Sequence, residues 1–95
     1  MVNILTSELT SYKTLKSNTI YLDTVPAVTA RMTVTTTSDN SNFVFGLSNN
    51  GGITFEEVTN GAVHTFTDAT GNEVQYQIWG KVPGIKISNV VVKIN

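Results

Sequence analysis

The sequence predicts an all-β protein folded as a single antiparallel β-sandwich. Threonine and valine are abundant, and both are β-branched residues that lose rotamer freedom in helices and pack well on a pleated sheet. From residue 19 onward, apolar and polar residues alternate in short runs, which is the period of a half-buried strand. Clusters of asparagine, aspartate, glycine and proline separate these runs at intervals of about ten residues. Together these patterns indicate about seven strands.

Length, charge and cysteine content narrow the classes of function. The 95 residues suffice for one domain with one core. Six basic residues stand against seven acidic ones, and neither sign is clustered, so we expect no nucleic-acid binding. The absence of cysteine excludes disulfides, thiolate catalysis and cysteine-based zinc sites. We expect no membrane insertion, because the longest apolar run, residues 90–92, is too short and the N-terminus lacks a signal-peptide pattern.

Residues 1–18 differ in pattern from residues 19–95, which are expected to form the sandwich domain. Leu5, Leu9 and Tyr12 recur at helical spacing, and a serine at position 7 could cap a short helix. The intervening residues are mostly serine and threonine, so an extended arm fits equally well. The three apolar residues are candidate anchors of an assembly arm that docks on a neighbouring subunit.

The first part of the sandwich shows two alternating runs. In the first run, which follows Ile20 and Leu22, the residues predicted to point inward are Val28, Ala30, Met32 and Val34. A turn cluster at residues 38–42 precedes the second run, in which Phe43, Phe45 and Leu47 point inward. Residues 49–52, with the sequence Asn-Asn-Gly-Gly, form the strongest hairpin signal in the chain. Residues 53–58 are the expected return strand.

The second part of the chain supplies the remaining strands. A turn at residues 60–61 leads into a strand over 62–67, and a second turn over 68–72 leads into the next run. In that run Val74, Tyr76 and Ile78 face inward, opposite to Gln75, Gln77 and Trp79. The last strand, over 85–94, changes the parity of its apolar residues at positions 88–89, which predicts a β-bulge. Seven such strands are typical of an Ig-like or jelly-roll sandwich.

A hairpin motif spans residues 48–55. Ser48, Asn50, Gly52, Thr54 and Phe55 resemble the Asp-box hairpin of sialidases and other β-proteins, with asparagine at the aspartate position and phenylalanine at the tryptophan position. An oxygen of the Asn50 side chain can accept hydrogen bonds from backbone amides of the turn. The resemblance implies a structural turn rather than a catalytic element.

A wider stretch, from Phe45 to Ile94, resembles small β-sandwich domains of tailed-phage structural proteins. The shared order begins with the Ser-x-x-Gly-Gly-x-Thr-aromatic hairpin at residues 48–55, followed by a valine at 58, a glycine at 61 and a phenylalanine at 66. It continues with a strand at 74–78, a proline at 83 and a strand that contains Ile-Ser-Asn at 87–89. The resemblance covers about half the chain. It implies a capsid-decoration, head-fibre or tail-accessory role in the virion, with other virion proteins and further copies of the chain as partners.

One aromatic residue suggests a second function. Trp79 lies on the face of Gln75 and Gln77, and an outward tryptophan beside amides can stack on a sugar ring. Tyr76 and Tyr21 are further aromatic candidates for a glycan site. The alternative is that the N-terminal arm or a neighbouring subunit covers Trp79, which would make this face an interface.

The chain offers no pattern for catalysis. His64 is the only histidine, so it lacks partners for a metal site or a triad and is expected to be an exposed strand residue. Glu56 and Glu57 are adjacent in a strand and point to opposite faces. We expect no enzyme activity, metal or cofactor. The expected function is that of a non-enzymatic virion structural protein, and the alternative is a carbohydrate-binding domain.

Overall fold

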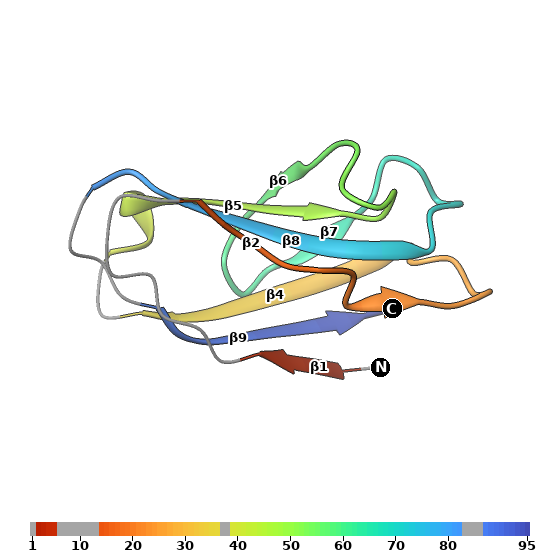
Figure 1. Ribbon diagram of the computed structural model, residues 1–95, viewed down its shortest axis with the longest axis horizontal. Helices are drawn as coiled ribbons and strands as arrows, with labels where there is room; N and C mark the ends of the chain where they lie inside the picture. Colours follow the sequence, from red (N-terminus) through yellow and green to blue (C-terminus); the bar gives the residue numbers. More distant parts are fainter. Residues whose placement is uncertain (1, 6–13, 37–38, 83–86) are drawn as a thin grey trace.

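The structure, a computed structural model, describes residues 2–5, 14–36, 39–82 and 87–95, and these form two antiparallel sheets packed face to face (Figure 1). The elements are β1 (Val2–Leu5), β2 (Thr14–Lys16), β3 (Tyr21–Leu22), β4 (Thr29–Thr36), the 3-10 turn η1 (Asn40–Asn42), β5 (Phe43–Ser48), β6 (Glu56–Val58), β7 (Val63–Thr65), β8 (Glu73–Gly80) and β9 (Ile87–Ile94). One sheet has four strands in the order β1-β9-β4-β7. The other has the order β2-β8-β5-β6, and β3 pairs with β8 as its fifth strand. The all-β sandwich prediction is confirmed.

One core fills the space between the sheets, as the alternating runs predict. Along β4 and β8, buried residues alternate with residues that point to solvent or to the outer faces, whereas β5 is buried at five of its six positions. Val28 departs from the prediction and is exposed, because β4 begins only at the next residue. The buried cluster consists of Ala27, Ala30, Met32, Val34, Phe43, Phe45, Leu47, Val58, Phe66, Val74, Tyr76, Ile78, Ile87, Val90, Val92 and Ile94.

The predicted bulge in the last strand is present. On the facing strand β4, Thr35 pairs with Asn89 and Thr36 pairs with Ile87, so Ser88 is the extra residue. The insertion lets Ile87 and Val90 both reach the core although their separation breaks the period of two. The bulge therefore places Ile87 in the same core as Val90, Val92 and Ile94.

Two parts of the N-terminal segment, for which the sequence suggested an arm or a short helix, are strands that pair with the sandwich. β1 pairs with β9 from Val2 opposite Lys93 to Leu5 opposite Val90. β2 pairs with the other sheet, with Lys16 opposite Gln77 on β8. Both strands satisfy backbone groups that β9 and β8 would otherwise leave open at a sheet edge. Leu9 and Tyr12 lie outside the described residues.

The predicted hairpin after β5 forms, with a shorter return strand. β6 has three residues, paired with β5 from Phe45 opposite Val58 to Leu47 opposite Glu56. Ile53, predicted to begin this strand, is 82% exposed in the loop. The next strand, β7, pairs with β4 of the four-stranded sheet, so the chain changes sheets between β6 and β7. This crossing closes one side of the sandwich.

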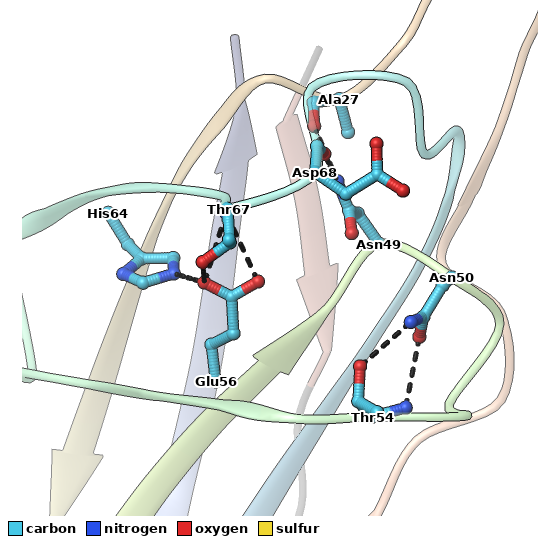
Figure 2. A network of polar contacts seen from close by, with 8 residues as sticks. All are labelled: Ala27, Asn49, Asn50, Thr54, Glu56, His64, Thr67 and Asp68. Atoms are coloured by element: carbon cyan, nitrogen blue, oxygen red, sulfur yellow. Dashed lines mark hydrogen bonds and ion pairs between the residues drawn. The ribbon is translucent and has the colours of Figure 1, made fainter.

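Three loops gather at one end of the sandwich, after β3, β5 and β7 (Figure 1). The buried side chain of Asn49 holds them together. Its Nδ2 donates hydrogen bonds to the carbonyl oxygens of Ala27, at 3.1 Å, and of Asp68, at 2.6 Å (Figure 2). Position 71 must be glycine, because a Cβ there would collide with Asn49. Asn49 thus fixes the loops that carry the exposed apolar residues Leu22 and Ile53.

Candidate functional site

A hollow lies on the outer face of the five-stranded sheet. Pairing across this sheet places Lys16, Gln77, Gly46 and Glu57 in one row, from β2 to β6. The adjacent row brings Trp79 of β8 beside a valine of β5. The hollow has a volume of about 350 Å³ and is lined by Val44, Phe45, Gly46, Phe55, Glu56, Glu57, Gln77 and Trp79. We call it the sheet groove.

Gly46 forms the floor of the sheet groove. Its position on β5 carries no side chain, and a Cβ added there would lie 3.4 Å from the Cβ of Phe55. A glycine in the interior of a strand lacks a side chain to pack, and it commonly marks a place where another group approaches the backbone. Trp79 stands beside this floor and is 39% exposed. The groove therefore offers an aromatic wall, an amide from Gln77 and a carboxylate from Glu57.

The Ser48–Phe55 hairpin positions the other wall. The Asn50 Oδ1 accepts a hydrogen bond from the Thr54 backbone N–H at 3.1 Å, and the Asn50 Nδ2 donates to the Thr54 Oγ1 at 2.8 Å (Figure 2). The Ser48 hydroxyl donates to Asn50 and accepts from the backbone N–H of Gly52 at 3.0 Å. Gly52 has a φ of 85°, which favours glycine.

Phe55, the aromatic residue of this turn, lines the sheet groove. The ammonium of Lys16 lies 5.2 Å from the centre of its ring, within the range of a cation–π contact. The turn motif identified in the sequence therefore has a second role, because it sets where an aromatic wall of the groove stands. The sequence reading assigned Phe55 to the turn alone and missed this placement.

Of the three residues predicted for an interface or sugar-stacking site, two line the groove. Trp79 and Gln77 do so, whereas the side-chain amide of Gln75 donates hydrogen bonds to the Gly51 carbonyl and the Thr19 hydroxyl, both at 3.3 Å. Gln75 therefore holds the hairpin loop. Tyr76 belongs to the core, which removes it as a stacking residue.

Reasoning from the sequence missed the groove residues on neighbouring strands. Val44, Gly46 and Glu57 reach the groove, and Lys16 comes beside its Phe55 wall, only through the pairing register, which a single sequence does not specify. Gly46, an isolated glycine within the alternating run 43–47, was the available signal.

His64 is half-buried and paired, which corrects the prediction of an exposed strand residue. Its Nε2 lies 2.9 Å from the Glu56 Oε1, and Thr67 donates its backbone N–H and its hydroxyl to the same carboxylate (Figure 2). The His64–Glu56 pair joins β7 to β6, at the side of the sandwich where the chain passes from one sheet to the other. Burial acts to raise the pKa of Glu56, but the hydrogen bonds from His64 and Thr67 outweigh it and hold that pKa below its ordinary value.

Within the described ranges, no three histidine, aspartate or glutamate side chains come together as metal ligands would. The same residues contain no helix long and apolar enough to cross a bilayer. The Glu56 carboxylate is engaged with His64 and Thr67. No protein-family model matches this chain, and a search of curated proteins likewise finds no match.

Proposed function

We propose that this chain is a non-enzymatic virion structural domain of a tailed bacteriophage, acting through protein–protein contacts as a capsid-decoration or tail-accessory component. The observation that carries the proposal is the resemblance of the stretch from Phe45 to Ile94 to phage sandwich domains. That stretch comprises β5 to β9, which contribute strands to both sheets.

The surface of the domain suits contact with neighbouring proteins. Among the described strands, β1, β6 and β7 each pair on one side only, which leaves backbone donors and acceptors at sheet edges. Leu22, Val25 and Ile53 are exposed on the loops that gather at one end. Apolar side chains exposed together favour burial against a partner. We therefore assign the loop end as the principal contact surface.

Fractionation of phage particles tests this proposal. Particles from a lysate are separated on a density gradient and probed with an antibody against the chain. The chain should sediment with the particles. A Leu22→Ser/Ile53→Ser double variant should lose that association, whereas Val63→Ser, at an equally exposed valine of β7, should retain it. Recovery of the wild-type chain only in the soluble fraction would contradict a virion role.

The sheet groove favours a second function, carbohydrate binding. Trp79 and Phe55 present aromatic surface, and Gln77, two residues before Trp79 on β8, can donate and accept hydrogen bonds. A volume of about 350 Å³ lies within the range of small-ligand sites. Each sugar hydroxyl requires such polar groups, and each sugar ring offers an apolar face for stacking.

Tryptophan fluorescence during titration with a panel of neutral oligosaccharides tests the second function. A saturable change is expected, with at least about tenfold weaker binding in Phe55→Ala and in Gly46→Val, which fills the groove floor. Thr33→Ala, at an exposed position of β4 on the other sheet and outside the groove, is the control. If no oligosaccharide of the panel gives a saturable change, the glycan function is wrong and the virion proposal is unaffected.

A further inference from the structure

The outer face of the four-stranded sheet carries two cations side by side. The register of β4 and β9 places Arg31 directly opposite Lys93. Both point outward, because their strand neighbours Ala30, Met32 and Val92 are buried in the core. Like charges in directly opposed positions of an antiparallel pair destabilise the sheet. The arrangement therefore has a cost that an anion bound between the two side chains would remove.

The described part of the chain supplies no anion to these cations. Its ion pair joins His64 and Glu56, at another side of the sandwich. The outward positions of β4, β7 and β9 contain no aspartate or glutamate at all, and consist of threonines, valines, Ser88, Asn89 and the two cations. No hydrogen bond from the side chain of Arg31 or Lys93 is formed within these residues. The pair is thus a cationic site on an otherwise uncharged face.

A hollow of about 260 Å³ adjoins the pair and is lined by Thr29, Ala30, Arg31, Val63, Lys93 and Asn95. Val63 of β7 lies directly opposite Arg31 and is 67% exposed, so it forms an apolar wall. The side-chain amide of Asn95 is engaged with Val28, Thr29 and Pro26, and the only charged side chains among the residues that line the hollow are those of Arg31 and Lys93. This geometry provides both the charge and the space for a small anionic group.

We propose that Arg31 and Lys93 form a binding site for an oxyanion, namely a carboxylate, phosphate or sulfate group. The guanidinium of arginine matches two oxygens of such a group, and the ammonium of lysine supplies a second positive charge. The site lies on the opposite sheet from the sheet groove and stands independently of both functions proposed above.

Amide chemical shifts during titration with sodium phosphate, and separately with sodium acetate, test the site at constant ionic strength set with sodium chloride. The expected result is a saturable shift at residues 29–31, 63 and 93 that chloride alone does not produce. Arg31→Gln and Lys93→Gln should each weaken binding at least about tenfold. Lys81→Gln, which changes the net charge equally, should bind as the wild type does. A shift that is absent, or that persists in both variants, would overturn the proposal.

A third titration distinguishes a free anion from one carried on a protein. A hexaglutamate peptide presents the same carboxylate on an extended chain. Binding of the peptide at least about tenfold tighter than acetate would identify acidic segments of a partner as the source. Equal affinities would identify a free small anion, and in both cases the same two variants must abolish the effect for the proposal to stand.

Discussion

The outer faces of the two sheets differ far more than their inner faces do. Inward, both sheets present the same kind of apolar residue at every second position. Outward, the five-stranded sheet carries aromatic rings, an amide and a bare glycine floor around the sheet groove, whereas the four-stranded sheet carries threonines and the Arg31–Lys93 pair. Burial of the shared core stabilises the sandwich, whereas the two outer faces offer different surfaces to ligands and partners.

The two sheets share one core, and shortening a core side chain in either sheet tests whether both contribute to it. Phe45 lines the five-stranded side, where it stacks on Phe43 with ring centres 5.4 Å apart, and Met32 is fully buried on the other side. Phe45→Ala should lower the free energy of unfolding by about 3–5 kcal/mol and Met32→Ala by about 2–5 kcal/mol. Urea titration should show one cooperative transition in each variant. A loss under about 1 kcal/mol for one of them would show that the sheet concerned contributes little to the shared core.

The loop end, in contrast to both sheet faces, depends on one buried polar side chain. Asn49→Ala removes two hydrogen bonds and leaves the carbonyl groups of Ala27 and Asp68 without their partner. We expect a loss of about 2–3 kcal/mol, because orphaned buried acceptors add their desolvation to the lost bonds. Asn18→Ala, at an exposed asparagine, should change stability by less than about 0.5 kcal/mol. Equal effects of the two substitutions in thermal unfolding would contradict the role of Asn49.

The inner faces were predictable from sequence because burial imposes a period of two. Residues 30–34, 43–47 and 74–78 alternate as predicted, and the parity change at residues 88–89 revealed the bulge. The hairpin at residues 49–52 was also predictable, since glycine there adopts positive φ angles. These signals are local, and each needs only a few neighbouring residues to be read.

The outer faces were not predictable, because their features arise from pairing between distant segments. The groove combines Gln77, Gly46 and Glu57 through register, and Arg31 meets Lys93 across 62 positions of sequence. Asn49 looks like a turn residue in the Asn-Asn-Gly-Gly run, yet its bonds reach Ala27 and Asp68. The strands β1 and β2 were not predicted for a related reason. An edge strand forms because a neighbouring strand has unpaired backbone groups, and its own sequence shows this only in part.

The side of the sandwich that His64 and Glu56 close should be sensitive to acid. The pKa of Glu56 is held below its ordinary value of 4.5, so the folded state is stabilised above that pH, and the stabilisation is lost as the pH falls through the lowered pKa. Glu56→Gln should cost about 1 kcal/mol at pH 7 and flatten the dependence of stability on pH below about 5.

The comparison of wild type and Glu56→Gln isolates this contribution. Hydrogen bonds from the hydroxyl and the backbone N–H of Thr70 also lower the pKa of Asp68. Because Asp68 is present in both proteins, its effect on stability cancels when the two pH curves are subtracted. Urea titrations between pH 3 and pH 7 provide the measurement. Parallel curves for the two proteins over this range would show that the Glu56 carboxylate adds no pH-dependent stability.

The smallest expected effect concerns the cations of the four-stranded sheet. Removing one charge of a directly opposed like pair should stabilise the sheet, so Lys93→Gln is expected to raise the free energy of unfolding by about 0.2–1 kcal/mol at low ionic strength. The gain should vanish near 1 M sodium chloride, where the screening length falls to about 3 Å. Lys81→Gln makes the same change in net charge away from the pair and should show no such gain. If both variants respond to salt alike, the repulsion belongs to the net charge of the domain, and the outer face of this sheet carries no local strain for an anion to relieve.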